Sequence, residues 1–69
     1  MRQLRRVIRK SQLRTYTGYG ATVNDELIKK DPSFPQPFPL RDGGRALGFF
    51  EDELIAWQEQ RAAAREAQN

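Results

Sequence analysis

A chain of 69 residues with no cysteine and no histidine has room for one domain and cannot form a disulfide framework or a Cys/His zinc site. No apolar run approaches the roughly 18 residues of a membrane helix, so we expect a soluble cytoplasmic protein without a membrane partner. The net charge of +3 is uneven, since the first 14 residues carry six basic side chains and no acid, whereas residues 51–69 carry five acids and two arginines.

The first seven residues are predicted to be a basic arm, and a short helix is predicted over residues 11–18. Ser11 is expected to cap the free amide groups at the start of this helix, and Gly18 to end it in the left-handed conformation. Because only about two turns are available, the helix depends on tertiary contacts.

A second helix is predicted over residues 22–31, after a glycine-flanked turn in which Tyr19 can point inward. Thr22 and Asp25 have the spacing of a capping box. Pro32 ends the helix, because proline disfavours helical geometry in the residue before it.

The apolar side chains of this second helix fall on one face, which we expect to pack on the core. These side chains are Val23, Leu27 and Ile28. The outer side of the helix is then expected to hold Asp25, Glu26 and Lys29.

The proline-rich segment that follows is predicted to be a loop in which Phe34 and Phe38 are core anchors. Phe38 and Leu40 then alternate with Pro39, and Leu47 and Phe49 alternate with Gly48. Between them lies Asp42-Gly43-Gly44, a strong hairpin signal because glycine accepts a positive φ. The apolar face of this hairpin is expected to lie against the helices.

A last helix is predicted to start near Asp52, which is a good cap, and to dock through Leu54 and Trp57. Residues 59–69 have high helix propensity but nothing large to bury. We expect this segment to project from the body or to fray.

The residues needed for catalysis are largely missing, so we expect neither an enzyme nor a bound cofactor. The chain has no histidine, which is the usual general base, and no cysteine, which is the strongest nucleophile. The acids Glu51, Asp52 and Glu53 are consecutive, so their side chains fan out around a helix start and do not converge on a metal ion.

Binding to double-stranded DNA is better supported. Two short helices joined by a glycine-containing turn are typical of a helix-turn-helix, which presents its second helix to the major groove. The fold class predicted is α+β, mostly helical: a small winged helix-turn-helix with a two-stranded hairpin wing and a C-terminal helix. Arg41 and Arg45 bracket the wing tip, where the arginine fork suits phosphates and narrow minor grooves.

The charge asymmetry also favours a polyanionic partner, although a solubilising arm is the alternative for the first segment and a solvated surface charge for each arginine alone. The candidate DNA-binding residues are Arg41 and Arg45 in the hairpin, Thr22, Asn24, Lys29 and Lys30 in the second helix, and Arg2, Arg5, Arg6, Arg9 and Arg14 in the basic front.

Several pieces of the chain resemble the AlpA family of phage and prophage regulators. They are Thr17-Gly18, a helix ending LIKKDPSFPQP, an apolar pair before a turn, GRAL, and an acidic cap followed by L-x-x-W, and together they run from about Ile8 to Trp57. The resemblance implies a MerR-like winged helix-turn-helix related to the excisionases. It further implies sequence-specific DNA binding in transcriptional regulation or in excision by recombination, with further copies of the chain or an integrase as protein partners.

The second helix departs from the family pattern. It has Asp25 and Glu26 where the family often has tyrosine and arginine, and Asn24 where the family tends to have an apolar core residue. Because carboxylates are repelled by phosphates, we expect the affinity to shift to the wing and the basic front, with Asn24 placed to read adenine. The acids also keep an alternative open, in which the chain is an adaptor or inhibitor that binds a protein through this helix and its acidic tail.

Overall fold

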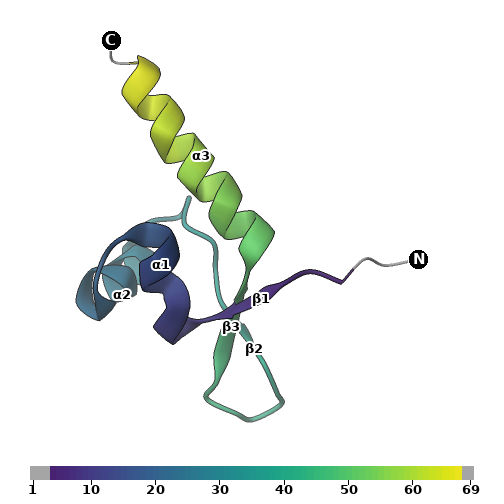
Figure 1. Cartoon of the computed structure of the whole chain (residues 1–69). Coiled ribbons are helices and arrows are strands. Elements are labelled where there is room, and N and C mark those ends of the chain that lie inside the picture. The colour runs from purple at the N-terminus through teal and green to yellow at the C-terminus, as the bar shows by residue number, and fades with distance from the viewer. Residues whose placement is uncertain (1–3, 68–69) are drawn as a thin grey trace.

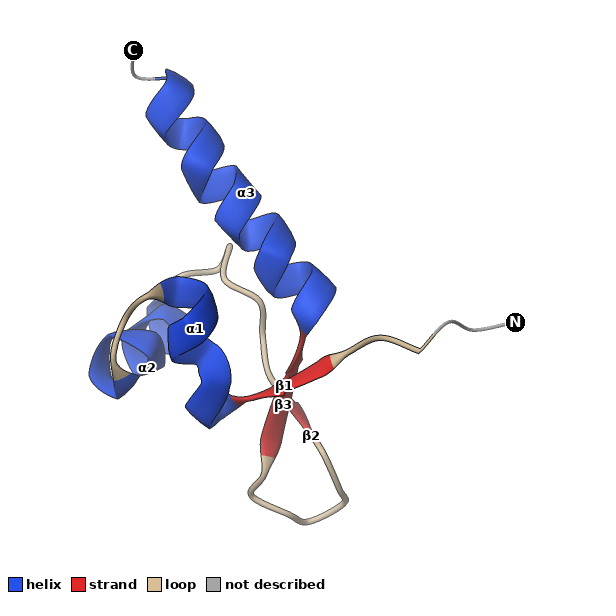
Figure 2. Cartoon of the chain, in the orientation of Figure 1, coloured by secondary structure: helices blue, strands red, loops and turns tan. Residues whose placement is uncertain are grey.

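The computed structural model describes residues 4–67, the side chains of residues 66 and 67 excepted. Over this range the chain is an α+β protein, helical for about half of its length, with three α-helices and a three-stranded antiparallel sheet (Figures 1 and 2). The elements are β1 (Val7–Arg9), a 3-10 turn η1 (Lys10–Gln12), α1 (Leu13–Thr17), α2 (Ala21–Lys30), β2 (Phe38–Pro39), β3 (Leu47–Phe50) and α3 (Glu51–Ala67). None of the helices within residues 4–67 has the length and apolar character needed to cross a bilayer.

The predicted first helix is confirmed as η1 followed by α1, but Ser11 does not cap it. Ser11 lies inside η1, and the Arg9 amide at the start donates to Oε1 of Gln12 at 2.9 Å. The end is as expected, since Gly18 has a φ of 78° and its amide donates to the Arg14 carbonyl at 2.8 Å. A residue with a side chain would be strained at this φ.

The second helix begins one residue earlier than predicted, with Gly20 at its N-cap position, so Thr22 lies in the first turn and is not the cap. Its end is confirmed, because Asp31 before Pro32 is extended, with a φ of −100° and a ψ of 106°. The tyrosine of the preceding turn, Tyr19, is exposed and does not point into the core.

The face of α2 that packs on the core is rotated by about one residue from the predicted face. Val23 is 41% exposed, whereas Asn24 is only 3% exposed, and Leu27 and Ile28 are partly buried against the core. Asn24 is tolerated inside because its amide is hydrogen-bonded: its Nδ2 donates to the Tyr19 carbonyl at 3.1 Å, and its Oδ1 accepts from the Thr17 hydroxyl at 2.8 Å. A buried polar side chain therefore closes the turn between α1 and α2.

A strand that the sequence analysis missed, β1, includes the last residue of the predicted basic arm. It pairs antiparallel with β3, with Val7 opposite Phe50, Ile8 opposite Phe49 and Arg9 opposite Gly48. The sheet has the order β1-β3-β2, so β3 is central and the expected two-stranded hairpin becomes part of a three-stranded sheet. The side chain of Ile8 is 2% exposed and belongs to the core.

The predicted hairpin is confirmed, with β2 and β3 antiparallel and Phe38 opposite Gly48. Its loop is closed by the Leu40 amide, which donates to the Ala46 carbonyl at 2.9 Å, and by a turn at Gly43, whose φ is 70°. The apolar face of the hairpin was expected to lie against the helices, and Phe49 of β3 does so, since it belongs to the core with Leu54 and Trp57. Phe38, the second predicted core anchor, is not part of the core. Leu40 is 40% exposed, and the ring of Phe38 stacks on Phe50 at 4.5 Å between centroids.

The core lies where the sheet, α1 and α3 meet. Six apolar side chains form it: Ile8, Leu13, Phe34, Phe49, Leu54 and Trp57. Phe34 is the loop anchor expected from the sequence, and its ring makes edge-on contacts with Phe49 and Trp57 at centroid distances of 6.2 and 5.1 Å.

The last helix follows β3 directly, so it begins at Glu51, and Asp52 lies in its first turn instead of capping it. Leu54 and Trp57 dock it as predicted. Its second half, which was expected to project or fray, is helical to Ala67 and extends away from the body, opposite to the hairpin loop (Figure 1).

Candidate nucleic-acid interface

The hairpin loop extends beyond the sheet and holds two exposed arginines, Arg41 and Arg45 (Figure 1). Among the side chains of residues 4–65, neither arginine has a carboxylate within ion-pairing distance. The stem of Arg41 lies over the turn, since a Cβ at Gly44 would come within 2.6 Å of the Cγ of Arg41. Both guanidinium groups are thus free to bind an anion.

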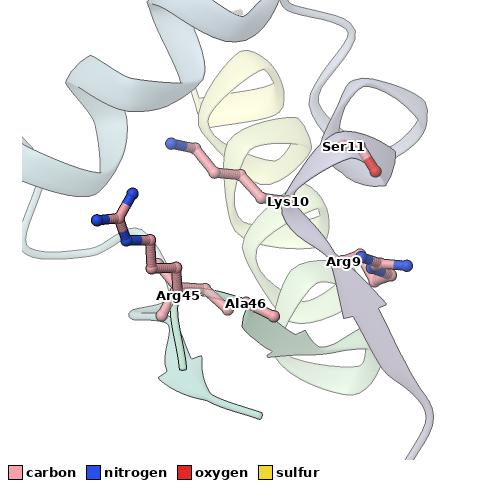
Figure 3. Close-up of a pocket in the computed structure, with 6 residues that line it drawn as sticks. Arg9, Lys10, Ser11, Arg45 and Ala46 are labelled. Atoms are coloured by element: carbon pink, nitrogen blue, oxygen red, sulfur yellow. The ribbon is translucent and has the colours of Figure 1, made fainter. Parts of the chain in front are cut away.

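Arg45 shares a surface hollow of about 260 Å³ with the front of the chain. Arg9, Lys10 and Ser11 line its other side, and Ala46 and Leu47 complete it. In Figure 3 the side chains of Lys10 and Arg45 extend in the same direction, whereas Arg9 points to the other side. The fold therefore brings Lys10, which follows β1, and Arg45 of the hairpin together into one cationic surface, and the pairing of β1 with β3 makes this possible.

One acid of α2 adjoins this surface and is neutralised there. The Oδ1 of Asp25 lies 2.5 Å from the Nζ of Lys10. The hydrogen bond from Lys10 holds the pKa of Asp25 below its ordinary value, and the charges of Lys10 and Lys29 act in the same direction. The carboxylate expected to repel phosphates is thus paired with a cation from η1.

The predicted α2 residues separate into two sides of the helix. Thr22 and Lys29 are exposed and lie three and four residues from Asp25, so they share the side that faces the cationic surface. Lys30 is also exposed, but it lines a different hollow with Val23 and Glu26. Asn24 is buried and its amide is occupied, so it does not face a groove.

The basic front is less free than its composition indicates. Arg5 is engaged by Asp52 at 2.8 Å and Arg6 lies 3.9 Å from Glu51, which places two of the candidates on acids of α3. Arg14 is exposed on α1 and Arg9 is exposed beside the hairpin. Arg2 lies outside the described residues.

The hydrogen bonds between the first turn of α3 and the segments before it shift the pKa values of the groups involved. Hydrogen bonds from Arg5 lower the pKa of Asp52 and raise the pKa of Arg5. The Tyr16 hydroxyl donates to Oε2 of Glu51 at 2.8 Å, and this bond raises the pKa of Tyr16. The first turn of α3 is therefore a structural anchor for β1 and α1, and its acids are not gathered around an ion site.

Sequence reasoning omitted Lys10 from the site, although it follows Arg9 directly and belongs to the basic front. Its place became apparent only when the pairing of β1 with β3 set η1 beside the hairpin. The side chains described in residues 4–65 include no cluster of three or more acids that is arranged to hold a metal ion. Anion binding by arginine and lysine is the chemistry that this surface offers.

Comparison of the chain with protein-family models, curated proteins and solved structures gives no match.

Proposed function

We propose that this protein binds double-stranded DNA as a small winged helix-turn-helix regulator of the AlpA, excisionase-related type. The observation that carries the proposal is the pair of exposed hairpin arginines, Arg41 and Arg45, neither of which meets a carboxylate among the side chains of residues 4–65. Lys10 lies beside Arg45 at the same hollow. Phosphate contacts supply most of the affinity in complexes of this kind, and such contacts need unpaired cations that lie on one side of a protein.

The arrangement of the helices supports the same proposal. α1 and α2 are joined by a three-residue turn, and the side of α2 with Thr22 and Lys29 also holds Asp25, which pairs with Lys10 beside the hairpin. On a duplex, α2 would enter the major groove while Arg41 and Arg45 meet the adjacent backbone or minor groove. Specificity would come from few base contacts, so neighbouring copies or a partner such as an integrase would contribute to regulation or excision.

A gel shift on DNA from the protein's own gene neighbourhood, at several salt concentrations, tests the proposal. About four phosphate contacts predict a slope of about −3 to −4 in log affinity against log salt. Replacing both Arg41 and Arg45 with alanine should weaken binding by at least about tenfold and make the slope shallower by about 1.8, because two contacts are lost.

The matched control removes two arginines from the projecting half of α3, Arg61 and Arg65, which are exposed and distant from the hairpin. Arg61→Ala/Arg65→Ala has the same net charge as the hairpin double variant. It should leave the salt slope within about 0.5 of the wild-type value. Equal losses in the two double variants would show that net charge, and not the hairpin, determines binding.

The alternative, an adaptor that binds a protein through α2, is favoured by one observation. Val23 is exposed and lines an apolar hollow with Leu27, beside Glu26. Two results together would support the adaptor instead. The wild-type chain would give no gel shift at low salt, and the Val23→Asp variant would lose binding to a protein partner.

A further inference from the structure

Arg5 has a set of contacts that a phosphate-binding side chain would not keep. Its Nε and Nη2 atoms donate to the two carboxylate oxygens of Asp52 at 2.8 and 2.9 Å, and Nη2 lies 3.4 Å from Oε2 of Glu53. The guanidinium carbon also lies 3.6 Å above the centre of the Phe50 ring. The planar fork is therefore bound on its edge by a carboxylate and on its face by an aromatic ring.

The contacts continue from Phe50 into the hairpin. The Phe50 ring stacks on Phe38, the first residue of β2, with a centroid distance of 4.5 Å and an interplanar angle of 25°. Asp52, Arg5, Phe50 and Phe38 thus form a continuous stack from the first turn of α3 to the base of the hairpin. We call these four residues the arginine stack.

The backbone and the neighbouring side chains tie the same elements together. The Glu51 amide donates to the Arg6 carbonyl at 2.8 Å, which continues the pairing of β1 with β3. The side chains of Val7 and Leu40 meet over Gly48. A Cβ added to Gly48 would lie 2.8 Å from Val7 and 2.7 Å from Leu40, so the segments on the two sides of β3 approach each other across it. The direction of the hairpin is therefore set where the segment around Arg5 docks.

We propose that Arg5 is a positioning residue: through the arginine stack it orients the hairpin relative to the helices, and it does not itself contact DNA. The orienting role follows from the contacts within the chain, whereas the consequence for DNA rests on the proposed function. A hairpin that samples other directions would present Arg45 to a duplex less often, so affinity would fall without the loss of a phosphate contact.

Amide exchange measured by NMR tests the orienting role without any DNA. The variant Arg5→Lys keeps the charge but loses the two-pronged bond and the flat stacking surface. Exchange of the Glu51 amide, which bonds to the Arg6 carbonyl and joins the segment around Arg5 to the start of α3, should be about fivefold faster than in the wild-type chain. Exchange of the Gly18 amide, which ends α1, should not change. An unchanged exchange rate at the Glu51 amide would overturn the orienting role.

The variant Asp52→Asn tests the consequence for DNA. Its affinity for DNA should rise if Arg5 binds phosphate and fall if Arg5 positions the hairpin. If Arg5 were a phosphate ligand, removing Asp52 would free it, so binding would tighten and the salt slope would steepen by about 0.9. If Arg5 positions the hairpin, Asp52→Asn should weaken binding about fivefold with an unchanged slope. Tighter binding with a steeper slope would refute the proposal.

The matched control for this measurement is Glu59→Gln, which makes the same charge change on the exposed part of α3. Its affinity for DNA should differ from the wild-type value by less than twofold, because exposed charges beyond a Debye length are screened. If the wild-type chain binds no DNA, the proposed function fails, and the exchange of the Glu51 amide still decides whether Arg5 holds the base of the hairpin against α3.

Discussion

Replacing Asn24 with alanine should destabilise the fold and leave the exposed hairpin arginines in place. The side chain joins α2 to the preceding turn, since it donates to the Tyr19 carbonyl and accepts from the Thr17 hydroxyl. The same hydroxyl accepts the Tyr19 amide at 3.1 Å, so one polar network holds the turn. Alanine leaves the Thr17 hydroxyl without its acceptor and the Tyr19 carbonyl without the Asn24 donor.

The magnitude follows from the two hydrogen bonds that are lost. Each contributes about 1 kcal/mol net, and the small cavity left by the buried amide adds to the loss, so Asn24→Ala should cost about 2–3 kcal/mol. A core of this size rarely supplies more than about 3–5 kcal/mol in total. The midpoint of thermal unfolding should accordingly fall by about 10–20 °C.

Thermal and urea unfolding, followed by circular dichroism, measure this loss, and DNA binding is then assayed at a temperature where the variant is folded. The control is Val23→Ser, one residue away but exposed, which should change the stability by less than about 0.5 kcal/mol. An Asn24→Ala variant that keeps wild-type stability but loses DNA binding would refute the structural role and restore the base-reading role.

Three further predictions concern stability. Gly43→Ala should cost about 1 kcal/mol in urea unfolding, because Gly43 has a φ of 70° and only strain, not a clash, opposes the new methyl group; an unchanged midpoint would contradict this. Phe34→Ala should cost about 3–5 kcal/mol and leave the chain largely unfolded by near-ultraviolet circular dichroism, since its ring joins the loop to Phe49 and Trp57; a native spectrum would exclude this role. Stability should be nearly constant between about pH 5 and 8 and fall as the pH drops below about 4. Hydrogen bonds hold the pKa values of Asp25, Asp31 and Asp52 below the ordinary 3.8, so the unfolded chain binds these protons first. Urea midpoints that do not decrease below about pH 4 would contradict this reasoning.

Signals that act within a few residues were readable without coordinates. Gly18 ends α1 because a positive φ favours glycine, and Pro32 ends α2 because it restricts the residue before it. The Asp42-Gly43-Gly44 turn between alternating apolar residues located the hairpin. The apolar anchors Phe34 and Trp57 were found because the segments around them offer few other large side chains to bury.

The predictions failed where contacts between segments far apart in the chain determine the structure. The residues Val7–Arg9 lie in a run of arginines, and nothing local shows that their strand partner is some 40 residues later in the chain. Asn24 was placed outside because its type is polar, but the burial of a polar side chain depends on whether the neighbouring turn supplies partners. Arg5 was counted as a free charge, since composition does not show which carboxylate a cation meets.

The amino-acid sequence by itself determined the three helices and the hairpin, the ends of the first two helices, most of the core and the presence of two arginines at a turn. The tertiary structure alone decided which cations are free, because pairing depends on distances between segments far apart in the chain. It brought Arg9 and Lys10 beside Arg45 and tied Arg5 to Asp52. Backbone preference acts over a few residues, whereas strand pairing and ion pairing are settled only when the whole chain has packed.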